Sequence, residues 1–190
     1  MSTELNTDMA RHPLGDADRR GDGTTVLVFV REYAFPAEQV WAMLTDPALT
    51  ELWWARTRGT ARTGSSFDLK WLNGKDMGEG NELDWWNGKV LAAEPGRLLE
   101  ISNAMHGVIR AEVVPLSGGA SDGGTRLVFT NAVHAPEEVV LMSLAGWHCH
   151  LDHLQEALEG KSVDWPHWWD DFYPAWEKIH AAYQAAQTQG

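Results

Sequence analysis

The segment from residue 26 to residue 54 constrains the fold more than any other part of the chain. Apolar alternation over residues 26–35 predicts a β-strand, because successive side chains of a strand point to opposite faces. Pro36 ends this strand and opens a helix, since proline is tolerated in the first helical turn. The pair Asp46-Pro47 then breaks the helix, and the Asp46 side chain can cap a second one. The sequence therefore predicts a strand followed by two short helices, closed by the pair Trp53-Trp54.

Residues 143–158 predict a long helix near the C-terminus. At 100° per residue, its apolar side chains fall on one face. This apolar stripe consists of Leu144, Trp147, Leu151, Leu154 and Leu158. Gly160 follows the last apolar residue and is a suitable helix end.

The middle of the chain is typical of antiparallel strands joined by polar turns. Gly59, Gly64 and the glycine-rich residues 73–81 bracket two short strands. The other predicted strands cover residues 83–91, 98–102, 108–115 and 126–133. Residues 94–97 (Glu-Pro-Gly-Arg) predict a type II turn, because proline presets φ and glycine accepts a positive φ.

The order of these elements resembles the START-like, or helix-grip, superfamily. The order is a strand, two short helices ending in Trp53-Trp54, a strand-rich middle, and a helix that opens with residues 146–150 (Gly-Trp-His-Cys-His). The branch that the chain looks most like is named after the activator of heat-shock protein 90 ATPase. The resemblance covers residues 24–185. It implies an α+β fold in which a curved antiparallel sheet of six or seven strands wraps around the helix at 143–158. It also implies a ligand cavity between the sheet and that helix.

One domain is expected over residues 24–190, including a tryptophan-rich C-terminal helical tail with its helical period after Pro174. Residues 1–23 contain too little apolar surface to offset their ordering entropy, so we expect a disordered leader. The leader has no apolar stretch typical of a secretory signal, and no segment reaches the roughly 18 apolar residues that cross a bilayer. We therefore expect no membrane insertion and a cytoplasmic location.

Charge and cysteine content narrow the classes of partner. The chain has 15 basic and 27 acidic residues, a net charge of −12, and no basic run. The negative electrostatic field of such a chain repels phosphate backbones, so nucleic acid is not an expected partner. Cys149 is the one cysteine of the sequence, which excludes an internal disulfide and fits a reducing compartment.

No motif for a cofactor or metal stands out. Residues 78–80 (Gly-Glu-Gly) lack the third glycine and the context of a dinucleotide site. Residues 148–153 contain several possible metal ligands. Helix geometry argues against a metal site there, because His148 and His150 point about 200° apart. No second cluster completes a tetrahedral site. We expect neither cofactor nor metal, and we expect His150 and His153 on the surface, facing away from the apolar stripe.

Candidate ligand-binding residues come from the tryptophans and from polar residues beside the apolar stripe. Small-molecule sites are mostly apolar and aromatic, and an indole adds one N–H donor to a large apolar area. His148 and Gln155 are seven residues apart and share one edge of the stripe; the alternative is that both lie at the solvent boundary. Asn131 interrupts an apolar set on its strand, and a buried amide needs a partner: a ligand, water or the protein itself. The candidates are Trp54, Trp71, Trp85, Asn131, Trp147, His148, Leu151 and Gln155.

Three functions are compatible with these features. The first is binding of a small hydrophobic or aromatic molecule between the sheet and the long helix. The second is a co-chaperone or protein-interaction module, as the name of the branch suggests. The third is a cyclase-like enzyme that uses His148 or Asp84 as acid or base, which needs a charged pair converging in the cavity. The tryptophan-rich tail either covers the protein's own core or binds a protein partner. Each single tryptophan named as a ligand-binding candidate could instead be a core-packing residue.

Overall fold

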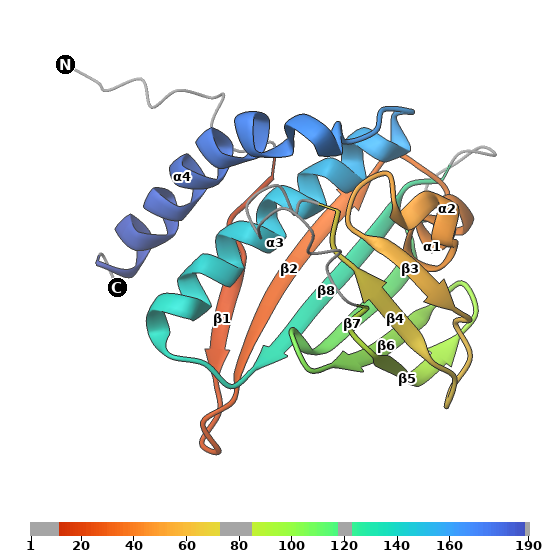
Figure 1. The fold of residues 1–190 in the computed structure, drawn as a ribbon, viewed down its shortest axis with the longest axis horizontal. Helices are drawn as coiled ribbons and strands as arrows, with labels where there is room; N and C mark the ends of the chain where they lie inside the picture. Colours follow the sequence, from red (N-terminus) through yellow and green to blue (C-terminus); the bar gives the residue numbers. More distant parts are fainter. Residues whose placement is uncertain (1–11, 73–84, 118–122, 189–190) are drawn as a thin grey trace.

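An antiparallel sheet and a long helix lying across it form the centre of the molecule (Figure 1). The computed structural model describes residues 12–72, 85–117 and 123–188. Its elements are β1 (Asp16–Arg19), β2 (Thr25–Tyr33), α1 (Ala37–Thr45), α2 (Pro47–Thr50), β3 (Arg56–Gly59), β4 (Phe67–Lys70), β5 (Gly88–Glu94), β6 (Leu98–Asn103), β7 (Gly107–Pro115), β8 (Thr125–Val133), α3 (Glu137–Leu158), a 3-10 turn (Trp165–His167) and α4 (Trp168–Gln187).

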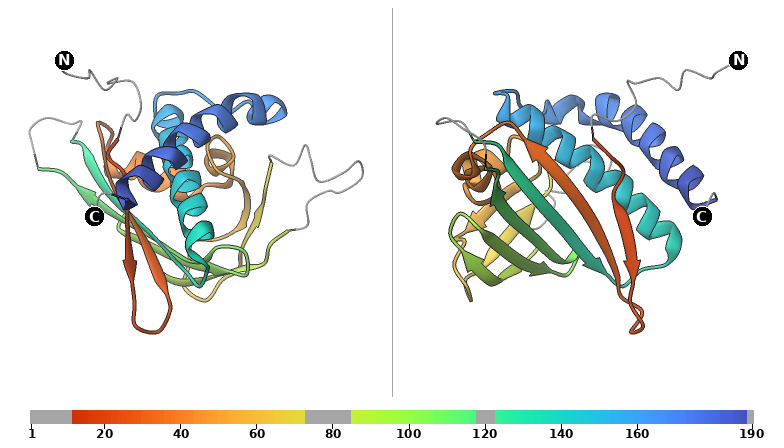
Figure 2. Two further views of the ribbon diagram at one scale, coloured as in Figure 1. Left: turned by 90° about the vertical axis from the view of Figure 1, so that its left-hand side faces the viewer. Right: turned by 180° about the vertical axis from the view of Figure 1, so that it is seen from behind.

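The main sheet has six strands in the order β1-β2-β8-β7-β6-β5, and every neighbouring pair is antiparallel. Strands β3 and β4 form a separate two-stranded sheet. Figure 2 shows α3 against one side of the curved main sheet, with α4 on the far side of α3. The predicted α+β helix-grip fold is therefore confirmed, with two short helices after β2 and a long helix held by the sheet.

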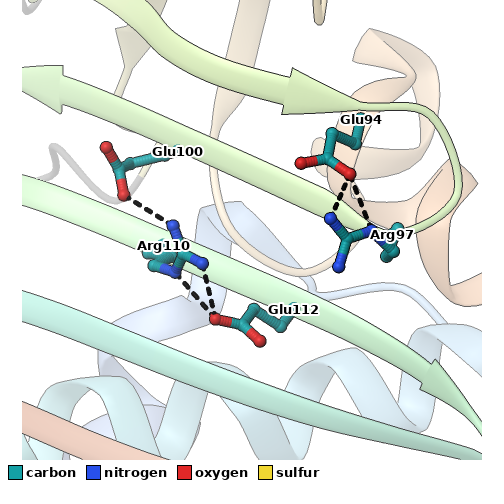
Figure 3. A network of polar contacts seen from close by, with 5 residues as sticks. All are labelled: Glu94, Arg97, Glu100, Arg110 and Glu112. Carbon is teal, nitrogen blue, oxygen red and sulfur yellow. Dashed lines mark hydrogen bonds and ion pairs between the residues drawn. The ribbon is translucent and has the colours of Figure 1, made fainter.

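The two faces of the sheet differ because apolar and polar residues alternate along its strands. On β6 and β7, Ile101 and Ile109 are paired in register and almost fully buried. Their neighbours Glu100 and Arg110 are also paired and face the other way, with Arg110 Nη1 3.0 Å from Glu100 Oε2. Figure 3 shows this ion pair extended to Glu112, whose Oε1 lies 2.8 Å from Arg110 Nε. The period of two thus gives one apolar face for α3 and one charged face.

Local signals placed the turns and caps correctly. The Asp46 carboxylate accepts a hydrogen bond from the backbone N–H of Ala48 at 2.9 Å, capping α2 as predicted. In the turn between β5 and β6, Arg97 N–H donates to the Glu94 carbonyl at 2.9 Å, and Gly96 has φ +73°. The positive φ agrees with the predicted type II turn. Trp53 is fully buried, and its indole N–H donates to the Met43 carbonyl at 2.9 Å, as expected of a packing residue.

The expectation of a disordered leader is wrong for residues 12–23. Residues 16–19 form β1, which pairs with β2 at the edge of the main sheet. Just before it, the backbone N–H of Gly15 donates to the Tyr183 hydroxyl of α4 at 2.7 Å. Residues 1–11 lie outside the described residues. Residues 12–23 have little apolar surface of their own, and they are ordered by contacts with β2 and with α4, which is distant in the sequence.

The boundaries of three other elements also differ from the prediction. Helix α3 begins at Glu137, not Ser143, and acidic Glu137 and Glu138 occupy its first turn, where they complement the helix dipole. Helix α4 begins at Trp168 and runs through Pro174, whereas the tail was expected to become helical only after that proline. Strand β5 begins at Gly88, later than predicted.

Candidate functional site

A pocket of about 490 Å³ lies between α3 and the ends of the central strands of the main sheet. The sheet side is made by the turn between β6 and β7 (residues 104–106), by Gly107 at the start of β7, and by the last residues of β8. The helix side is made by Val139, Ser143, Gly146, Trp147 and His150. These five residues are three or four positions apart or adjacent, so they share one face of α3. Trp71, which follows β4, completes the wall.

Four aromatic rings from three parts of the chain pack together in this wall. The ring centroid of Trp71 is 5.3 Å from that of His106 and 5.4 Å from that of His150. The centroid of Trp147 is 5.6 Å from His106 and 6.1 Å from His150. Each imidazole therefore contacts both indoles. We call Trp71, His106, Trp147 and His150 the four-ring cluster.

Asn131 supports this cluster from β8. The Trp147 indole N–H donates to Asn131 Oδ1 at 2.9 Å. Asn131 Nδ2 in turn donates to the carbonyls of His106, at 2.5 Å, and Val108, at 3.1 Å. The amide is 1% exposed and finds its partners within the protein, which agrees with the alternative of a satisfied core asparagine. It fixes Trp147 and the turn that carries His106.

Both histidines of the cluster are neutral at physiological pH. Burial lowers the pKa of His106 to about 4. Burial, followed by the nearby His153, lowers the pKa of His150 to about 3. His106 Nδ1 is 3.2 Å from Asn103 Oδ1, and His150 Nδ1 is 3.2 Å from the Trp53 carbonyl. A carbonyl oxygen only accepts, so in both rings Nδ1 carries the proton and Nε2 keeps its lone pair.

The structure brings three of the predicted site residues together at the pocket: Trp71, Asn131 and Trp147. Trp54 lies behind them, 3% exposed, with its ring centroid 5.6 Å from that of Trp147. Trp85 lies elsewhere, under the guanidinium of Arg58, whose Cζ is 4.3 Å from the ring centroid.

The other three predicted residues do not line this pocket. His148 is fully buried on the side of α3 that faces α4, with Nδ1 3.2 Å from the Tyr183 hydroxyl. Leu151 is also fully buried, and its carbonyl accepts a hydrogen bond from Tyr33 at 3.4 Å. The Gln155 side chain donates to Glu159 Oε1 at 2.8 Å. A ligand contact by any of these three side chains stays a prediction.

The expectation that His150 lies on the surface is wrong, and His153 is half-buried. His150 is 5% exposed, with its ring stacked on Trp168 at 6.3 Å and tilted against Phe172 at 5.8 Å. The His153 ring is 6.3 Å from Phe172. The physical reason is that α4 covers the side of α3 that the apolar stripe left open, so residues 147–151 are all buried.

His106 also lines the pocket and was not among the predicted site residues. It lies in a three-residue turn between two predicted strands, where Asn103 Oδ1 accepts the backbone N–H groups of Met105 and His106. Asparagine followed by a glycine four residues later is a turn signal that could have been read from the sequence. Nothing local, however, shows that this turn meets the long helix.

A second pocket, of about 630 Å³, lies between α3 and α4. Its lining includes Asp152, His153, Glu156 and Asp171 with one cation, Lys178. Across residues 12–72, 85–117 and 123–188, no three His, Cys, Asp or Glu side chains are grouped so as to hold a metal ion. In the same ranges, no helix is long and apolar enough to cross a membrane.

Several solved structures share this architecture. The crystal structure of CalU16 from Micromonospora echinospora is 22% identical and has a TM-score of 0.62, with 90% of this chain and 94% of that chain covered. Its solution structure gives 23% identity, a TM-score of 0.65 and coverage of 98% and 100%. EF2215 from Enterococcus faecalis, a conserved protein of unknown function, is 13% identical, with a TM-score of 0.64 and coverage of 92% and 91%. These likenesses support the fold alone.

No protein of curated function matches the chain. Residues 34–159 match the family described as Activator of Hsp90 ATPase homolog 1-like protein. The match spans more than half of the chain, from the end of β2 to the end of α3, and includes the whole of the pocket's wall. The resemblance inferred from the sequence is confirmed: the chain belongs to the family of Activator of Hsp90 ATPase homolog 1-like proteins.

Proposed function

We propose that this protein binds a small hydrophobic or aromatic molecule in the pocket between α3 and the main sheet. The observation that carries the proposal is the pocket of about 490 Å³, walled by the indoles of Trp71 and Trp147. Ligand pockets of roughly 300–1,000 Å³ with aromatic walls and a few fixed polar groups are typical of small-molecule sites. The family membership and the position of the pocket between sheet and helix support the same function.

Gly146 supports the proposal from the helix side. It lies on the pocket face of α3, and a Cβ built on it would meet no atom within 4 Å. The helix therefore leaves space at this position that a side chain could fill. A glycine within a helix costs about 1 kcal/mol relative to alanine, so the open space comes at a cost in stability.

The pKa values favour binding over catalysis. A general base works best when its pKa is near the working pH. The pKa of His106 is about 4 and that of His150 about 3, so both are weak bases at neutral pH. Of the two residues considered for a cyclase-like enzyme, His148 has its pKa lowered by burial to about 3 and lies against Tyr183 of α4, and Asp84 lies outside the described residues.

The contacts of α4 support a covering role for the tryptophan-rich tail. Its buried side chains are Trp168, Phe172, Ile179 and Tyr183. Trp168 and Phe172 pack on His150 of α3, and Tyr183 packs on His148. A protein partner bound through the tail, as in a co-chaperone, stays a prediction.

The proposal is tested by filling the pocket from α3. N-phenyl-1-naphthylamine is a neutral aromatic probe whose fluorescence rises in an apolar site. We expect saturable binding to the wild type with a Kd in the micromolar range, about −8 kcal/mol. Gly146→Phe should weaken binding at least tenfold, because its ring occupies the space next to Trp147 and His150.

Gly146→Ala is the matched control. It adds one carbon into open space and should keep most of the affinity while raising the free energy of unfolding by about 1 kcal/mol. Equal probe binding by the wild type and the Phe variant would show that the probe binds elsewhere and would refute the proposed site.

A further inference from the structure

We infer that the pocket selects neutral aromatic molecules that carry a hydroxyl or N–H group, and that this group donates a hydrogen bond to Nε2 of His106 or His150. The inference deepens the proposed function and rests on it. The four-ring cluster offers two kinds of surface in one place: indole faces for an aromatic ring, and imidazole lone pairs for a donor.

The first step is the direction in which each imidazole presents its free nitrogen. Nδ1 of both rings is held by a carbonyl oxygen, of Asn103 for His106 and of Trp53 for His150. Within the described part of the chain, no hydrogen bond reaches Nε2 of either ring. Neither atom is among the side-chain nitrogens that are both without a partner and sealed, that is, closed off from solvent. By contrast, Nε2 of His148 and of His153 is sealed. Both His106 and His150 line the pocket, and Nε2 is the ring nitrogen that each has left to offer a ligand there.

The second step is that the indole donors of the wall are already used. Trp147 Nε1 donates to Asn131 at 2.9 Å, and Trp71 Nε1 donates to the Met105 sulfur at 2.8 Å. A ligand that only accepts hydrogen bonds gains nothing from either indole. A ligand that donates meets two neutral imidazoles, each with a free lone pair. An unpaired acceptor costs free energy when a ligand displaces its water, so the pocket penalises ligands without a donor.

The third step concerns charge. Both imidazoles are neutral, and the whole chain has a net charge of −12. Among the described residues that line the pocket there is no lysine or arginine, so a carboxylate would lose its hydration in this wall without meeting a permanent cation. Charged anions are therefore disfavoured, and a phenol or an aromatic amide or amine fits better than an aromatic or fatty acid.

The experiment compares three ligands with nearly the same apolar area: 2-naphthol, 2-methoxynaphthalene and 2-naphthoate. Affinities are measured at neutral pH by quenching of tryptophan fluorescence. We expect 2-naphthol to bind about tenfold more tightly than 2-methoxynaphthalene, equivalent to about 1.4 kcal/mol, as one hydrogen bond allows. The naphthoate should bind more weakly than either.

The variants His106→Asn and His150→Asn remove Nε2 and Cε1 from the ring and keep a nitrogen that corresponds to Nδ1. The amide nitrogen of asparagine can occupy the place of Nδ1 and keep the bond to Asn103 or to the Trp53 carbonyl. At least one of these variants should reduce the ratio of naphthol to methoxynaphthalene affinity to about two or less. His167→Asn is the matched control, since that histidine is exposed, pairs with Asp164 and lies outside the pocket.

The wild type alone already decides the inference if an asparagine variant fails to fold. On titration with 2-naphthol, the ¹⁵N resonance of Nε2 in His106 or His150 should shift, and 2-methoxynaphthalene should not shift it. If naphthol and methoxynaphthalene bind equally, or if both asparagine variants keep the wild-type ratio, the inference is overturned while the proposed function stands. If none of the three ligands binds, the proposed function itself fails.

Discussion

Tyr183→Phe should destabilise the fold without touching the pocket, because the Tyr183 hydroxyl joins three distant parts of the chain. It accepts the backbone N–H of Gly15 at 2.7 Å and lies 3.2 Å from His148 Nδ1. Burial raises the pKa of Tyr183 to about 12, so the hydroxyl keeps its proton and can donate it to His148. The N-terminal strand, α3 and α4 are thereby connected through one oxygen atom.

The magnitude follows from the two bonds and their burial. Tyr183 is 3% exposed and His148 is fully buried, so water cannot replace the lost hydroxyl. Two hydrogen bonds at roughly 0.5–1.5 kcal/mol each predict a loss of about 2 kcal/mol in the free energy of unfolding. For a chain of this size, such a loss lowers Tm by about 5 °C.

Urea denaturation followed by tryptophan fluorescence measures this loss. Tyr173→Phe is the matched control on the same helix, since Tyr173 is 45% exposed, and it should change stability by less than about 0.5 kcal/mol. Binding of N-phenyl-1-naphthylamine should be the same in both variants and the wild type. A loss no larger for Tyr183→Phe than for Tyr173→Phe would refute the reasoning.

Two further predictions concern buried titratable groups. In the folded protein the pKa of His106 is about 4 and that of His148 and His150 about 3, against 6.5 for an ordinary histidine, and burial is the main cause in each case. The unfolded chain therefore takes up protons that the native state does not bind, so the free energy of unfolding should be nearly constant between about pH 7 and about pH 8 and fall as the pH drops from 6.5 towards 4. Urea midpoints measured across this range test the slope, and a flat profile would contradict it. Burial also raises the pKa of the Cys149 thiol to about 12, and the side chain is 4% exposed. Because the thiolate is the reactive form, an aromatic disulfide reagent should label Cys149 far more slowly in the native protein than in denaturant. Rapid, stoichiometric labelling of the native protein would be the opposite result.

Features set by neighbouring residues were predictable from the sequence. Asp46 caps α2 because its side chain reaches the N–H of Ala48, two positions along the chain. Gly96 shapes its turn because glycine accepts the required positive φ. The alternation along β6 and β7 fixed which side chains face α3, and the order of elements was enough to identify the family. Each of these depends on spacing within a few residues or on a pattern repeated along one element.

The composition of the pocket was decided by the tertiary structure. Trp71, Asn131 and Trp147 were expected there from their residue types, and the fold brings them together. His106 joins them because the turn between β6 and β7 meets α3, a contact between segments more than 30 residues apart. Helical phase showed that His148 and His150 face different ways, but the expectation that the pocket lies on the side of His148 was wrong, because His150 lines it and His148 packs against Tyr183.

The reason is that an amphipathic pattern shows which face of a helix is apolar and not what covers the opposite face. In this protein α4 covers it, so His148 and His150 are both buried, one against Tyr183 and the other in the four-ring cluster. The same α4 binds Gly15 next to β1 and so contributes to ordering a segment whose own composition predicts disorder. Sequence alone determined the elements and their order; the packing of α4 on α3 determined which histidines face the pocket and which support the core.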